Sequence, residues 1–213
     1  MNLYIIRHGE STWNSKNRIQ GNSNPPLSRL GMVQAKLLAK RFRKIKIDKI
    51  YSSPFLRSLQ TAQIIAKVLK LKVVKRGALK EVGLGEWEGK SPDEIDRLYD
   101  NNYQRWLRYG PTKIKIPGAE NIASFRKRVK RVFYDIIKEN KDRDILVVTH
   151  GGVIAAFLAH LLDADFDKLI LALHLPNTCV TLISIDKDRS YLIHIADTAH
   201  LFLKNAKGIW PNR

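Results

Sequence analysis

Residues 3–10 read LYIIRHGE and residues 145–152 read ILVVTHGG, so two apolar runs each end in a histidine that is followed by glycine. Short, continuous apolar runs of this kind are typical of strands that are buried on both faces of a parallel sheet. In an open α/β sheet the ligand site lies beyond the carboxyl ends of the strands. His8 and His150 would stand at that edge, with Arg7 beside one of them. The two runs therefore predict an α/β fold with an anion site that contains a histidine nucleophile.

Strand-like and helix-like segments alternate along the rest of the chain, which favours an α/β architecture. Ser28 is a predicted helix N-cap, and Ser53-Pro54 is predicted to open another helix as N-cap and first residue. That second helix would place Arg57 near an N-terminus whose dipole attracts anions. We expect a three-layer α/β/α sandwich whose central sheet is mainly parallel, with an antiparallel edge. The pattern predicts helices at about 28–44, 54–69, 121–140 and 152–162, and further strands at 48–52, 72–75, 180–185 and 191–196.

The length of 213 residues suits one domain, 1–213, with one large core. Within it, residues 90–120 are predicted to form a lid-like insertion and residues 197–213 a C-terminal tail. No apolar run approaches the length of a membrane span, and the N-terminus lacks the pattern of a signal peptide. Cys179 is the single cysteine, so no internal disulfide can form. These features predict a cytoplasmic protein without a membrane partner.

The formal net charge of +18 is the unusual feature of the composition. Basic residues crowd 36–49 and 126–131, and binding of nucleic acid is one interpretation. A solvated, lysine-rich helix surface, as in many heat-adapted proteins, is the other. Both runs follow amphipathic helical patterns and lack the interleaved aromatic residues of single-strand binders, which favours the second interpretation. A positive field would also steer small anionic substrates toward a cleft.

Five blocks of the chain stand in a fixed order: residues 7–14 (RHGESTWN), 26–34, 52–62, 81–89 and 117–120. Together with the second histidine run they resemble the histidine phosphatase superfamily, which contains the cofactor-dependent phosphoglycerate mutases. The resemblance covers residues 1–185 and implies a phosphoglycerate mutase-like fold. One departure is Ala119, which stands where the family usually has the second glycine of a Pro-Gly-Gly-Glu turn.

The residue types of the histidine runs suit phosphoryl transfer. This reaction needs an oriented, uncharged nucleophile and positive groups around the phosphoryl oxygens. His8 would attack phosphorus and form a phosphohistidine, while Arg7 and Arg57 offer the forked donors that match phosphate. His150, if protonated, would add a further positive group. Gly9 leaves the backbone open to the phosphate.

The resemblance implies further site residues. Glu81 would protonate the leaving alkoxide and then deprotonate the attacking water. Asn14 would bind the phosphoryl group, Gln20 and Gly21 would line the substrate side, and Gly151 would leave room for the phosphate. The histidines lack the spacing of a zinc site and the arginines supply positive charge, so we expect a metal-independent enzyme without a cofactor. Other carboxylates of the same blocks compete with Glu81 for its role: Glu10, Glu86 and Glu88.

Two reactions suit such a site, namely hydrolysis of a phosphomonoester and transfer of the phosphoryl group between two hydroxyls. The mutase branch carries a longer insertion between the positions of Glu81 and His150, and this chain lacks its basic, proline-rich segment. A shorter lid admits water, which favours a phosphatase that acts on small phosphorylated metabolites. A 2,3-bisphosphoglycerate-dependent phosphoglycerate mutase is the alternative, and a non-catalytic nucleic-acid-binding protein is a remote one. We expect no nucleic-acid partner, and the resemblance implies a homodimer.

Overall fold

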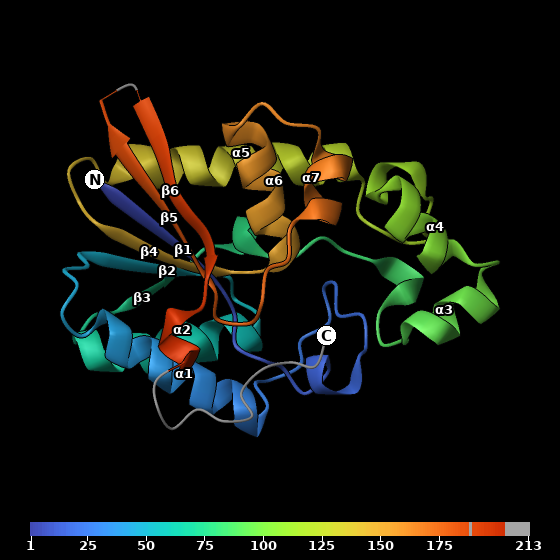
Figure 1. The fold of residues 1–213 in the computed structure, drawn as a ribbon, viewed down its shortest axis with the longest axis horizontal. Coiled ribbons are helices and arrows are strands. Elements are labelled where there is room, and N and C mark those ends of the chain that lie inside the picture. Colours follow the sequence, from blue (N-terminus) through green and yellow to red (C-terminus); the bar gives the residue numbers. More distant parts are fainter. Residues whose placement is uncertain (188, 203–213) are drawn as a thin grey trace.

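A computed structural model describes residues 1–187 and 189–202. Six strands form one mixed sheet in the order β3-β2-β4-β1-β5-β6, with helices on both faces (Figure 1). The predicted three-layer α/β/α architecture with an antiparallel edge is confirmed. Four strands run parallel, namely β1 (Asn2–Arg7), β2 (Lys49–Ser52), β3 (Val73–Lys75) and β4 (Ile145–Thr149), whereas β5 (Val180–Asp186) and β6 (Arg189–Asp197) form the antiparallel edge.

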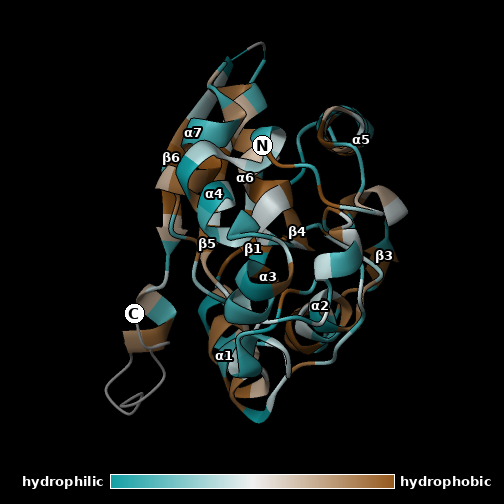
Figure 2. Cartoon of the chain, turned by 90° about the vertical axis from the view of Figure 1, so that its right-hand side faces the viewer, coloured by the Kyte–Doolittle hydropathy of each residue, from teal (hydrophilic) through white to brown (hydrophobic). Residues whose placement is uncertain are grey.

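Each face of the sheet has its own hydrophobic core because successive strand residues point to opposite faces. Leu3 and Ile5 of β1 pack with α5 (Ile122–Glu139) and α6 (Gly151–Leu161), and α7 (Phe166–Ala172) adds to this cluster. Ile6 points the other way, toward α1 (Arg29–Phe42) and α2 (Leu56–Leu69). Figure 2 shows hydrophobic residues concentrated on α6 and the central strands, whereas α4 is mainly hydrophilic.

Helix starts follow the predicted caps at one site and depart from them at another. Ser28 caps α1 as predicted, since its hydroxyl accepts a hydrogen bond from the Gly31 amide at 2.9 Å. The predicted start of α2 at Ser53-Pro54 is wrong: the helix begins two residues later, and its N-cap Phe55 makes no side-chain capping bond. The Ser53 hydroxyl accepts a hydrogen bond of 3.3 Å from the Phe55 amide and also lies 2.8 Å from a ring nitrogen of a distant histidine. Ser53 thus bonds the backbone just before α2 without serving as its N-cap.

Two short helices occupy the segment that was predicted as a lid-like insertion. They are α3 (Pro92–Leu98) and α4 (Asn102–Tyr109), followed by a 3₁₀ turn at Pro111–Lys113, and they lie to one side of the sheet (Figure 1). A capping box between Ser91 and Glu94 starts α3. The role of a lid stays a prediction.

The predicted C-terminal tail falls partly outside the described residues. Its described part includes a 3₁₀ turn at Ala199–Phe202, where His200 and Leu201 are buried against the body of the protein. Residues 203–213 lie outside the described residues. Among the residues that are described, no helix combines the length and the apolar character that a membrane crossing requires.

Candidate active site

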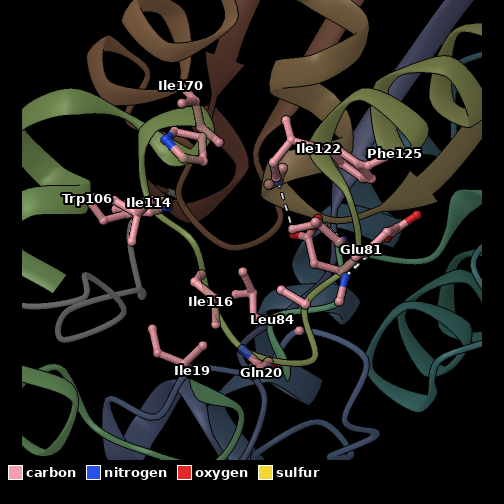
Figure 3. Close-up of a pocket in the computed structure, with 18 of the residues that line it drawn as sticks. Ile19, Gln20, Glu81, Leu84, Trp106, Ile114, Ile116, Ile122, Phe125 and Ile170 are labelled. Carbon is pink, nitrogen blue, oxygen red and sulfur yellow. Dashed lines mark hydrogen bonds between the residues drawn. The ribbon is translucent and has the colours of Figure 1, made fainter. Parts of the chain in front are cut away.

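A pocket of about 1000 Å³ opens beyond the carboxyl ends of β1 and β4 (Figure 3). His150 is not among its lining residues; it lies behind His8, and the two ring centroids are 5.2 Å apart. Gly9 does not line the pocket either, and a Cβ there would meet the Gly31 carbonyl oxygen at 2.8 Å. The remaining predicted site residues all line this one pocket: Arg7, His8, Asn14, Gln20, Gly21, Arg57, Glu81 and Gly151.

The surroundings of His8 fix both its tautomer and its charge. Its Nδ1 lies 2.7 Å from the Gly9 carbonyl oxygen, which can only accept, so the ring proton is on Nδ1. Nε2 therefore keeps its lone pair. Burial lowers the pKa of His8 well below its ordinary value, and the charges of Arg57 and Arg7 lower it further. His8 is thus neutral at pH 7, the state that a nucleophile requires.

Two guanidinium groups flank this histidine, of which Arg57 is buried and Arg7 half-buried. Arg57 donates from Nη1 to the Ser23 carbonyl at 2.6 Å and from Nη2 to the Gly21 carbonyl at 2.9 Å. Arg7 donates from Nη1 to the Leu175 carbonyl. The Nε atom of each arginine is buried and has no partner. Since buried donors are nearly always satisfied in proteins, both atoms suit the oxygens of an anion.

Burial also lowers the pKa of Arg57 to about 10, with Arg7 lowering it and Glu81 opposing the shift. At this value the guanidinium remains protonated at neutral pH. Burial likewise lowers the pKa of Arg7. The two positive charges are therefore held in a low-dielectric environment, where their attraction for a phosphoryl group is stronger than in water.

His150 is fully buried and contacts two hydroxyl groups through one ring nitrogen. Its Nε2 lies 2.8 Å from Ser53 Oγ and 3.4 Å from Ser58 Oγ, while Nδ1 has no partner. Burial lowers its pKa well below the ordinary value, and Arg57 and His8 lower it further. His150 is therefore neutral at pH 7 in the unliganded site, and the positive charge considered for it would require a bound anion that raises this pKa.

Glu81 stands at the N-terminus of α6. Its Oε2 accepts a hydrogen bond from the Gly152 amide at 3.0 Å, and its Oε1 accepts one from the Val82 amide at 3.0 Å (Figure 3). Arg128 donates from Nη2 to the Glu81 carbonyl at 2.9 Å, which fixes the backbone below the carboxylate. The carboxylate thus has a defined position at the side of the pocket.

The three competing carboxylates do not line the pocket. Glu10 and Glu86 each accept a hydrogen bond from a side-chain hydroxyl elsewhere. Glu88 accepts two hydrogen bonds from the loop next to Gly21 and a third from the Leu84 amide. Within the described residues, no three histidine, cysteine or acidic side chains gather into a group that could hold a metal ion. Of the four carboxylates, the geometry favours Glu81.

The predicted loop residues take defined places. Asn14 Oδ1 accepts a hydrogen bond from the Ser11 amide at 3.1 Å, and Gln20 Oε1 accepts one from the Ser11 hydroxyl at 2.8 Å. Both amide groups therefore keep NH₂ donors for a ligand. Gly21 has a φ of +48° and supplies its carbonyl to Arg57, so it supports the arginine through its backbone.

Several residues that support the site were not predicted from the sequence. Asn177 donates to the His8 carbonyl at 3.1 Å, and Thr61 Oγ1 accepts a hydrogen bond from the Gly9 amide at 3.0 Å. Thr61 and Ser53 belong to the block 52–62, so that block was a usable signal for them. Asn177 and Arg128 carry no local signal, because only the folded chain brings them to the site.

Comparison with known proteins shows the family to which this chain belongs. Residues 3–198 match the model of the histidine phosphatase superfamily (branch 1). The chain is 34% identical to a putative phosphoserine phosphatase of Hydrogenobacter thermophilus over 93% of this chain and 96% of that protein. It is 32% identical to a probable phosphoglycerate mutase of Yersinia pestis over 76% of this chain and 75% of that protein.

A solved structure agrees with this result. A mutant phosphoserine phosphatase from Entamoeba histolytica, in complex with phosphoserine, superposes with a TM-score of 0.82. The match is 31% identical and covers 94% of this chain and 98% of that chain. The chain described here is a member of the histidine phosphatase superfamily, branch 1.

Proposed function

We propose that this protein hydrolyses phosphomonoesters of small metabolites through a phosphohistidine on His8. The observation that carries the proposal is the hydrogen bond between His8 Nδ1 and the Gly9 carbonyl. It leaves Nε2 as the nucleophilic nitrogen of a neutral imidazole that lines the pocket. Arg7 and Arg57 line the same pocket, and the buried Nε atom of each is an unpaired donor for the phosphoryl oxygens.

In the first step, His8 Nε2 attacks phosphorus and the bond from phosphorus to the ester oxygen breaks. Arg7 and Arg57 stabilise the negative charge on the phosphoryl oxygens during the transfer. Glu81, protonated before this step, gives its proton to the leaving oxygen, so a neutral alcohol departs. The products of the step are a phosphohistidine and an ionised Glu81.

In the second step, the ionised Glu81 takes a proton from a water molecule. The water oxygen attacks phosphorus, and the bond between phosphorus and Nε2 breaks. Inorganic phosphate leaves, His8 regains its lone pair, and Glu81 is again protonated. One carboxylate therefore serves as acid and then as base, which suits its position at the side of the pocket.

The choice between hydrolysis and mutase activity depends on access of water to the phosphohistidine. The pocket of about 1000 Å³ leaves space for water beside a small ester. The similarity to phosphoserine phosphatases makes phosphoserine a substrate to test first. The mutase remains the alternative, because a probable phosphoglycerate mutase is also among the relatives.

The test measures both products on one protein sample. Release of inorganic phosphate is followed with phosphoserine and with a panel of other phosphomonoesters, and isomerisation of 3-phosphoglycerate is followed with and without 2,3-bisphosphoglycerate. We expect phosphate release from several esters and no dependence on the bisphosphate. Rapid isomerisation that requires 2,3-bisphosphoglycerate, with little phosphate release, would favour the mutase and overturn the proposal.

A further inference from the structure

The outer part of the pocket contains a group of apolar side chains together with exposed cations, and it lies away from the inner part where the proposed chemistry takes place. Ile114 and Ile116 follow α4 in the chain, and with Trp106 of α4 they form one wall, whereas Ile19 and Leu84 come from two other loops (Figure 3). All five side chains are half-buried. A charged phosphoryl group does not bind to apolar side chains, so these side chains are available to contact the alcohol part of the ester.

Backbone hydrogen bonds hold these walls in place. Residues 117–120 pair with residues 83–86 through an antiparallel bridge and two hydrogen bonds, of 2.9 and 3.0 Å, which fix the chain next to Ile116 and Leu84. Ile19 exchanges two further backbone hydrogen bonds, both of 2.9 Å, with Gly89 and Lys90. The outer pocket is therefore formed before a ligand binds, which reduces the entropy that binding must overcome.

The charged groups of the pocket do not suit the ammonium group of an amino-acid ester. Among the described residues that line it, the acidic ones are Glu81 and Glu120. Glu81 is assigned to proton transfer, and Glu120 accepts hydrogen bonds from Arg128 Nε at 2.7 Å and Nη2 at 2.8 Å. Four exposed cations also line the pocket, and their charge attracts any phosphorylated substrate: Arg18, Lys113, Lys115 and Arg126.

We infer that the outer pocket is a binding site for an apolar leaving group. The enzyme would then prefer phosphomonoesters of alcohols with an extended alkyl or aromatic body over phosphoserine. This inference rests on the proposed function, because it concerns the alcohol that departs when His8 is phosphorylated. The hydrophobic effect supplies the preference, since each methylene of the alcohol that enters the pocket leaves water.

Ethyl, butyl and hexyl phosphate provide the test because their leaving alcohols are similar in acidity and differ in apolar surface. We expect kcat/KM to rise about fourfold for each methylene until the pocket is filled. Hexyl phosphate should also exceed phosphoserine in kcat/KM. Ile116→Ala should lower the ratio of hexyl to ethyl phosphate about tenfold. Ile193→Ala makes the same change on β6, where the side chain is 55% exposed, and should leave the ratio unchanged.

A second variant is needed because the loop around position 116 could rearrange in Ile116→Ala and change the ratio for that reason. Ile116→Trp fills the pocket instead of enlarging it, so the rise in kcat/KM should stop at a shorter chain than in the wild type. Equal kcat/KM for ethyl and hexyl phosphate in the wild type would overturn the inference, as would a hexyl preference that both Ile116 variants retain. If no ester is hydrolysed and no phosphoenzyme forms, the proposed function itself fails, which is a different result.

Discussion

Glu81 Oε2 and the Gly152 amide are joined by a hydrogen bond of 3.0 Å at the start of α6. A Cβ at position 152 would lie only 2.5 Å from Glu81 Oε1, so the carboxylate occupies space that only glycine leaves free. The carboxylate accepts a hydrogen bond from one of the backbone donors that a helix leaves unpaired at its N-terminus. The second histidine run continues into α6, and through the Gly152 amide it positions the residue that is proposed as the proton donor.

Gly152→Ala should therefore displace Glu81 and lower kcat by about 10- to 100-fold, within the range that general acid–base catalysis contributes. The midpoint of thermal unfolding should not fall, because the group that has to move is the flexible end of a side chain. Steady-state kinetics and thermal unfolding measure the two effects. Gly77→Ala is the matched control, since a Cβ there meets nothing within 4 Å. Full activity of Gly152→Ala would show that the position of Glu81 does not matter.

Arg57→Lys should lower kcat/KM by about 100-fold or more, although the positive charge is kept. A lysine cannot contact the Ser23 and Gly21 carbonyls as a fork and still present a further donor to the phosphoryl group. Arg29→Lys, at an exposed position on α1, is the control. If Arg57→Lys retains the kcat/KM of the wild type, charge alone is sufficient and the forked geometry has no role.

The pH dependence of kcat/KM should report the pKa of His8. The neutral imidazole is the active form, so the acidic limb of the profile should fall as His8 becomes protonated, and this fall should lie below pH 6.5. Arg57→Gln removes a positive charge that lowers the pKa of His8, so the acidic fall of kcat/KM should move to higher pH. The maximal kcat/KM of the variant should also be lower than that of the wild type. A pH-rate profile of each protein measures this. A shift of the profile to lower pH in the variant would refute the assignment.

His200 should make the protein less stable in acid. Its Nε2 lies 3.0 Å from Thr178 Oγ1, and burial lowers its pKa from 6.5 to about 4. The unfolded chain therefore binds more protons between these values, so the free energy of unfolding falls as pH decreases from 6.5 to 4, by roughly 3 kcal/mol from this group. Urea unfolding at several pH values should show a smaller decrease in His200→Gln. His160→Gln, at an exposed site, should keep most of the decrease.

The sheet and the inner part of the site follow from local sequence. Continuous apolar runs mark buried strands, and because parallel strands end at one edge, the sequence predicts His8 and His150 at the same edge. The two lie close together because β1 and β4 are neighbours in the sheet. The start of α1 could also be predicted, because the Ser28 hydroxyl and the Gly31 amide that it caps are only three residues apart in the chain.

Features that depend on distant contacts could not be predicted in this way. Ser53 has the sequence of an N-cap, but its hydroxyl contacts His150, 97 positions away. The place of His150 behind His8, outside the pocket lining, results from packing that no local pattern encodes. Arg128 lies in a basic run that gave no sign of its hydrogen bonds to the backbone below Glu81.

The most direct test of the account is rapid quenching of the protein with a ³²P-labelled phosphomonoester. The wild type should carry an acid-labile label that is stable in base, as expected for a phosphohistidine, and peptide mapping should place it on His8. His8→Ala should carry none, whereas His160→Ala should be labelled like the wild type. Label that persists in His8→Ala, or that maps to another residue of the wild type, would contradict the account.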